Sequence, residues 1–159
     1  MSIIRYNWTH ENWCRPSDPI NIIFENISLD EIGNFLKKRG WRSKFTLGFD
    51  HVVPYPNIFQ KIKQTRQFIG PGLFCILKRC HIRLWKIEGK ILGAVHYDRL
   101  RSAHHEVTDF ESVEQYFSDE CSTNKSWEVL VDEIDLKNSF SSYKQPYNNG
   151  KATLIRRKK

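Results

Sequence analysis

The chain has 159 residues, of which 40% are apolar and 13% aromatic, as expected of one ordinary globular domain. This composition excludes a disordered chain, and no apolar run approaches the roughly 18 residues of a membrane-spanning helix. Lysine and arginine outnumber aspartate and glutamate by 25 to 18, which gives a formal net charge of +7. A basic excess favours an anionic partner, so we expect an anionic small molecule or a nucleic acid.

The four cysteines are scattered without a CxxC spacing, and the first residues lack the apolar core of a signal peptide. Reduced thiols and the absence of a targeting segment favour a cytoplasmic protein. The basic residues gather in two places, at residues 37–44 and in the tail at residues 151–159. Both are read here as solvated surface.

The expected elements begin with an irregular arm over residues 1–19 and a short buried strand over residues 21–24. Ser28 and Glu31 then have the spacing of a capping box, which predicts a helix over about 29–39.

A Pro- and Gly-containing stretch at residues 43–57 is expected to be a loop, followed by a short helix over about 58–67. Two segments rich in Ile, Leu, Val and Trp come next, at residues 74–87 and 90–98, with Glu88-Gly89 between them. This pattern predicts a long β-hairpin.

Thr108 and Glu111 form a second possible capping box, which predicts a helix ending near Asp119. The other expected elements are a polar loop at 100–107, a strand at 127–134, a loop at 137–150 and a strand at 152–156. We therefore predict a single α+β domain over residues 1–150, followed by a terminal strand and basic tail at 151–159. Its sheet should be mainly antiparallel, with a long hairpin, and covered on one face by two or three helices.

The hairpin register brings the strongest chemical candidates together. If Glu88-Gly89 is a two-residue turn, His81 lies directly opposite His96. Period-two alternation then places Arg79, Arg83 and Asp98 on the same face. Two imidazoles about 5 Å apart at Cβ could share a metal ion, bind an anion or act as an acid–base pair.

The segment after the hairpin adds His104, His105 and Glu106, a few residues before the expected helix. Amides near a helix N-terminus favour a phosphate or carboxylate, so these residues are expected to converge with the hairpin histidines. We assign catalytic roles to His81, His96 and His105. Ligand-binding roles are assigned to Arg79, Arg83, Asp98, His104 and Glu106. No metal ligand is assigned and no cofactor is identified.

Three stretches of the chain resemble the domain found at the C-terminus of LssY-type proteins. The matching motifs are Asp18-Pro19-Ile20-Asn21 through Gly40-Trp41, His81-Ile82-Arg83-Leu84-Trp85 with Gly93-Ala94, and His104-His105-Glu106-Val107-Thr108-Asp109 with Glu111. The resemblance covers about residues 18–118. That domain can follow a membrane phosphatase domain and also occurs alone, so the resemblance implies a phosphate-containing ligand.

The leading expectation is a small domain that handles a phosphate-bearing or other anionic ligand and that could be a phosphoester hydrolase using its paired histidines. The alternative is a non-catalytic module that binds nucleic acid or another protein through its basic clusters. A scaffold protein without a site is the third reading, and the sequence determines no oligomeric state.

Overall fold

The structure is a computed structural model that describes residues 8–11, 15–44, 51–54, 61–63, 65–70, 78–101, 104–142 and 145–159. Its two helices are α1 (Leu29–Lys38) and α2 (Glu111–Ser122). Neither of these helices, the only ones among the described residues, is long and apolar enough to cross a membrane. The strands are β1 (Trp8–Glu11), β2 (Arg15–Pro19), β3 (Ile22–Glu25), β4 (Arg42–Lys44), β5 (His51–Pro54), β6 (Lys61–Lys63), β7 (Arg66–Ile69), β8 (Lys78–Ile87), β9 (Lys90–Arg101), β10 (His104–Asp109), β11 (Trp127–Asp135), β12 (Phe140–Ser142), β13 (Gln145–Asn148) and β14 (Lys151–Arg157).

The largest sheet has eight strands in the order β11-β14-β3-β9-β8-β7-β4, and β10 pairs with β9 beside this path. The pair of β14 and β3 is parallel, and the other pairs of this sheet are antiparallel. Smaller sheets are formed by β2-β1-β5-β6 and by β12-β13. This architecture confirms the predicted α+β fold with a mainly antiparallel sheet and a long hairpin.

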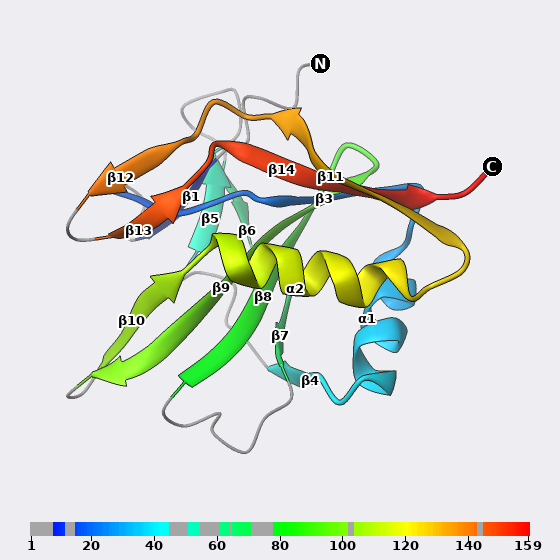
Figure 1. Ribbon diagram of the computed structural model, residues 1–159, viewed down its shortest axis with the longest axis horizontal. Helices are drawn as coiled ribbons and strands as arrows, with labels where there is room; N and C mark the ends of the chain where they lie inside the picture. The colour runs from blue at the N-terminus through cyan, green and yellow to red at the C-terminus, as the bar shows by residue number, and fades with distance from the viewer. Residues whose placement is uncertain are drawn as a thin grey trace.

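Apolar side chains fill both faces of the large sheet. On one face, α1 and α2 pack over a core that includes Phe24, Ile82 and Phe117. Figure 1 shows α2 lying across this face. On the other face, Trp85 and Leu92 belong to a second buried cluster. The hairpin β8–β9 is therefore buried on both of its faces.

The helix α1 begins and ends as the sequence predicts. Ser28 accepts a hydrogen bond from the Glu31 backbone N–H at 3.2 Å, and the Glu31 carboxylate accepts one from the Ser28 N–H at 3.1 Å. Gly40 adopts a φ of 81°, a left-handed conformation that suits glycine after a helix. The chain then returns to the core at Trp41, which is 2% exposed.

The hairpin turn also follows the prediction. Glu88 and Gly89 both have positive φ angles, 47° and 80°, as a two-residue type I′ turn requires. The register of β8 and β9 pairs His81 with His96 and Ile82 with Val95, which confirms that the two histidines face each other as predicted.

Three expectations for the first half of the chain are wrong. The arm at 1–19 contains β1 and β2, the loop at 43–57 contains parts of β4 and β5, and the helix at 58–67 is replaced by β6 and the start of β7. These strands are only three to five residues long, too short to give a recognisable period-two pattern, and β1 pairs with β5, about 40 residues away. Such long-range pairing overrides local propensity.

The second half needs two corrections as well. The polar loop expected at 100–107 is mostly strand, because β9 runs to Arg101 and β10 begins at His104. The loop at 137–150 likewise contains β12 and β13. Helix α2 forms as expected, but Thr108 does not cap it; Asp109 accepts a hydrogen bond from the Ser112 N–H at 2.9 Å instead.

The basic tail is more ordered than a solvated charge run. Strand β14 lies between β11 and β3 and includes Arg156 and Arg157. Arg156 pairs with Glu128 at 2.6 Å, and Arg157 pairs with Glu31. Only the last two lysines extend beyond the strand.

Candidate functional site

The paired histidines form the centre of a buried polar cluster. The ring centroids of His81 and His96 are 4.1 Å apart, with their planes inclined at 76°. Their exposed fractions are 0% and 2%. The second hydrophobic cluster, which includes Trp85 and Leu92, lies on the same face of the hairpin.

Two carboxylates lie beside the imidazoles. Asp98 follows His96 by two residues on β9, and its Oδ2 is 2.9 Å from His81 Nε2. Asp18, on β2, places its Oδ2 3.8 Å from His96 Nδ1. Both aspartates are 3% exposed. We call His81, His96 and Asp98 the histidine cluster, and Asp18 is its nearest further carboxylate.

The position of Asp18 depends on Asn21, whose side chain binds the backbone of β9. The Asn21 amide donates to the Val95 carbonyl and accepts from the Val95 N–H, both at 2.9 Å. Asn21 thereby extends the pairing with β9 by one residue before β3 begins. This anchor fixes the chain three residues after Asp18 and keeps that carboxylate near His96.

An arginine and a glutamine complete the polar surroundings. Arg83 Nη1 lies 2.7 Å from Asp18 Oδ2, and the arginine side chain is 13% exposed. The Gln67 amide, on β7, is 2.7 Å from His81 Nδ1. Strands β2, β7, β8 and β9 therefore each supply part of the site.

Burial controls the charge of both imidazoles. Loss of hydration lowers the pKa of His96 well below its usual value of 6.5, and the neighbouring His81 lowers it further. Burial also lowers the pKa of His81, although the Asp98 carboxylate opposes this shift. Both rings are therefore neutral near pH 7 and offer a lone pair rather than a positive charge.

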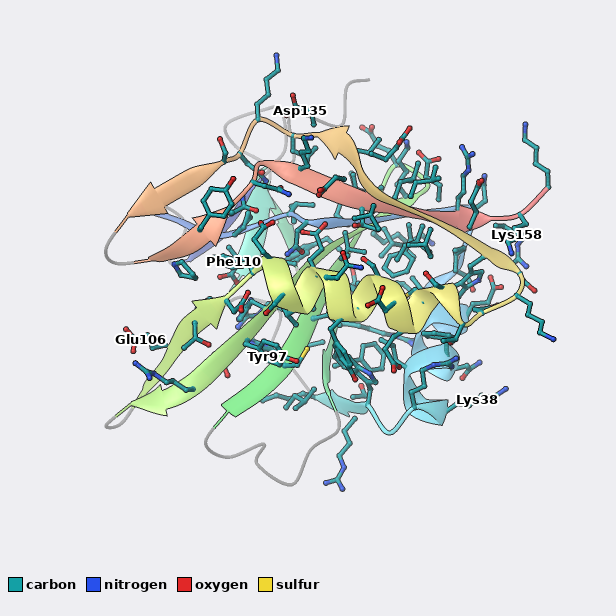
Figure 2. All side chains as sticks on the ribbon, in the orientation of Figure 1. Lys38, Tyr97, Glu106, Phe110, Asp135 and Lys158 are labelled. Atoms are coloured by element: carbon teal, nitrogen blue, oxygen red, sulfur yellow. The ribbon has the colours of Figure 1, made fainter. Side chains whose placement is uncertain are left out.

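An aromatic ring packs next to the cluster. Phe110, 1% exposed, lies with its centroid 6.0 Å from that of His96. Figure 2 shows Phe110 where β10 passes into α2. The start of this helix therefore contributes an apolar wall to the site.

The structure does not bring all the predicted site residues together. Glu106 pairs with Arg99 at 3.5 Å, and Figure 2 shows it toward the outer part of β10. The backbone of His105 lies opposite Leu100 and that of His104 opposite Arg101. These positions are four and five residues beyond His96 along β9, or about 13 Å and more at a strand's rise.

The structure describes the backbone of His104, His105 and Arg79 but not their side chains. Strand register places the Arg79 backbone opposite Asp98. Their assigned roles therefore stay predictions, whereas His81, His96, Asp98 and Arg83 are brought together as expected.

Sequence reasoning missed Asp18 and Gln67 as members of the site. Asp18 was part of the quoted resemblance but received no role, and Gln67 fell in the helix predicted at 58–67. Each comes from a strand whose partner is far along the chain. The local signal for Asp18 was weak: an acidic residue three positions before the buried strand expected at 21–24.

The cluster has the residue types that a metal ion binds. One ligand atom from each of His81, His96 and Asp98 lies within 4.8 Å of the others. The same groups could also move protons, because an imidazole next to a carboxylate is a common general base.

No model of a known protein family matches the chain, and neither does any curated protein or solved structure. The function proposed below is therefore inferred from the geometry and chemistry of the site.

Proposed function

We propose that this protein binds a phosphate-bearing or other anionic small molecule and hydrolyses a phosphoester at the histidine cluster. The observation that carries the proposal is the contact between His81, His96 and Asp98 on one buried face. Buried polar groups of this kind are costly to maintain and gather at functional sites.

Hydrolysis needs a group that takes a proton from the attacking water. A neutral imidazole does this near pH 7, and the lowered pKa of each histidine keeps the base form populated. Asp98, whose Oδ2 is 2.9 Å from His81 Nε2, would stabilise the positive charge that the cluster gains once the proton has moved.

An anionic substrate also needs a positive group near the cluster. Arg83 is the closest described candidate, and its planar guanidinium suits phosphate oxygens. The resemblance to the LssY-type C-terminal domain supports the same class of ligand. Because Arg83 already contacts Asp18, it alone supplies little net charge.

The alternative, a nucleic-acid or protein-binding module, is favoured by one observation. A surface pocket of about 320 Å³ is lined by basic and aromatic side chains, including Lys38 and Trp127. Figure 2 shows Lys38 and Lys158 at the same end of the molecule. However, Arg39 and Arg157 at this pocket pair with Glu120 and Glu31, which reduces its positive field.

The proposal is tested by assaying p-nitrophenyl phosphate and bis(p-nitrophenyl) phosphate with the wild-type chain and Asp98→Asn. The substitution keeps the shape of the side chain but removes the negative charge beside His81. We expect kcat to fall by about 100-fold or more, the usual contribution of a positioned acid–base group.

Glu114→Gln is the matched control, because it also converts a buried carboxyl to an amide but lies outside the cluster. It should retain wild-type kcat. If the wild type hydrolyses neither ester, or if Asp98→Asn is as active as Glu114→Gln, the hydrolase proposal is wrong. Salt-dependent binding of a nucleic acid would then favour the alternative.

A further inference from the structure

One ring nitrogen of each histidine in the cluster lacks a hydrogen-bond partner among the described residues. Among the described residues, neither His81 Nε2 nor His96 Nδ1 makes a hydrogen bond, although both atoms are fully buried. Asp98 Oδ2 is only 2.9 Å from His81 Nε2, but this contact is not directed as a hydrogen bond. A buried polar nitrogen without a partner destabilises the fold, so the two nitrogens point to a bound group that would pair with them.

The charge around these nitrogens favours a cation. Among the described side chains near these nitrogens, Asp98 and Asp18 contribute two negative charges and Arg83 contributes one positive charge. For these three described side chains the formal sum of −2 and +1 is −1, and both aspartates are buried. An anion entering this site alone would be repelled, whereas a divalent ion would change the sum to +1.

The geometry points to a binding site for one divalent transition-metal ion, held by His81, His96 and Asp98. Two imidazole nitrogens and one carboxylate oxygen suit zinc and its first-row neighbours, whereas magnesium and calcium prefer oxygen ligands alone. Three protein ligands leave at least one coordination position open, as in catalytic zinc sites.

The spacing of the ligand atoms is close to what such an ion needs. Ligand atoms around a tetrahedral zinc ion lie about 3.3 Å apart, as its bond lengths of about 2.0–2.2 Å imply. The three candidate atoms here lie within 4.8 Å of one another. Side-chain movements of about 1 Å would close them around the ion, and the paired strands hold the ligands in register.

Gln67 is placed to orient the first ligand. Its amide is 2.7 Å from His81 Nδ1. With the amide oxygen turned to the ring, Gln67 accepts a hydrogen bond from Nδ1–H, which leaves the Nε2 lone pair for the metal. A partner on the second ring nitrogen is typical of metal-bound histidines. Gln67 is thus a positioning residue.

A bound metal ion would replace the histidines as the group that activates water, because a ring nitrogen that binds the ion cannot also take a proton. It offers positive charge to an anionic substrate, and it lowers the pKa of a bound water so that hydroxide forms near neutral pH. This catalytic part of the inference rests on the proposed function, whereas metal binding itself does not.

The test is calorimetric titration of the chelator-treated full chain with Zn²⁺, with Mg²⁺ as the comparison ion. We expect one zinc per chain and no comparable binding of magnesium. Asp98→Asn should weaken zinc binding by at least about 100-fold, while Glu114→Gln should bind as the wild type does. Gln67→Leu should weaken it by about 10- to 100-fold, as loss of a supporting hydrogen bond does at other metal sites.

Measurements on the unaltered chain keep the test decisive if a cluster variant fails to fold. Zinc should raise the thermal midpoint of the wild type, because it binds the folded state, and a chelator should reverse the shift. Failure of the folded wild type to bind zinc overturns the inference. So does equal binding by a folded Asp98→Asn variant.

The two proposals can fail separately. Stoichiometric zinc binding at the cluster without ester hydrolysis would refute the hydrolase and leave the metal site standing. Hydrolysis by wild-type chain that binds no zinc would refute the metal site and leave the hydrolase, whereas hydrolysis undiminished by chelator in a chain that does bind zinc would refute only the catalytic role of the metal.

Discussion

At the scale of single residues, burial sets the protonation state of the polar side chains inside this protein. Glu114, on α2, shows this outside the histidine cluster. Its Oε1 accepts hydrogen bonds from the Thr153 N–H at 3.1 Å and hydroxyl at 2.9 Å. Its Oε2 is buried and has no hydrogen-bond partner among the described residues. Burial raises the pKa of this carboxyl from 4.5 to about 8, so it is protonated near pH 7.

Glu114 should make the protein less stable as the pH rises. Between pH 4.5 and about 8 the folded chain keeps a proton that the unfolded chain has released. The free energy of unfolding should therefore fall by about 1 kcal/mol per pH unit in this window. Glu114→Gln cannot ionise and should lose this dependence. Urea unfolding at pH 6.5 and pH 8 measures the difference, and equal slopes for the two proteins would contradict the prediction.

The buried histidines act in the opposite direction and in another pH window. Their lowered pKa means that the unfolded chain gains protons before the folded chain does as the pH falls below 6.5. Their contribution to stability is present above pH 6.5 and is lost on acidification. The urea unfolding that tests Glu114 is therefore made at pH 6.5 and above, where the histidines no longer change the stability.

At the scale of elements, the C-terminal strand carries more of the fold than its basic sequence suggests. Arg156 lies opposite both Glu25 of β3 and Glu128 of β11, and Arg157 lies opposite Trp127. A strand paired on two sides cannot be shortened without loss of backbone hydrogen bonds.

Deleting residues 156–159 should lower the free energy of unfolding by about 1 kcal/mol or more, because strand pairs and two ion pairs are lost. Deleting only Lys159, which is exposed, should change it by less than about 0.5 kcal/mol. Denaturant unfolding compares the two truncated chains with the wild type. Similar small effects of both deletions would show that the end of β14 adds little to stability.

The elements that could be predicted are those whose signals are local. Helix α1 has its capping box, and hairpin β8–β9 has a Glu-Gly turn between two apolar segments. By contrast, β1, β2, β5 and β6 are short and polar, and depend on partners far along the chain. The same dependence on local signals explains why only some of the site residues could be predicted. The hairpin register gave His81 opposite His96, whereas Asp18 and Gln67 depend on strand pairings that no local pattern shows.

At the scale of the whole molecule, the histidine cluster and its surroundings exist only when four strands have assembled. Asp18 comes from β2, Gln67 from β7, His81 and Arg83 from β8, and His96 and Asp98 from β9. Because the unfolded chain has no such arrangement, metal binding at the cluster should be coupled to folding. The location of a bound ion therefore tests the fold and the proposed chemistry together.

The most direct measurement is X-ray diffraction from zinc-loaded crystals, recorded at wavelengths on both sides of the zinc absorption edge. We predict one anomalous peak within about 2.0–2.2 Å of a ring nitrogen of His81, a ring nitrogen of His96 and a carboxylate oxygen of Asp98. A zinc-loaded crystal in which the peak lies on other residues, with these three side chains unbridged, would contradict the account.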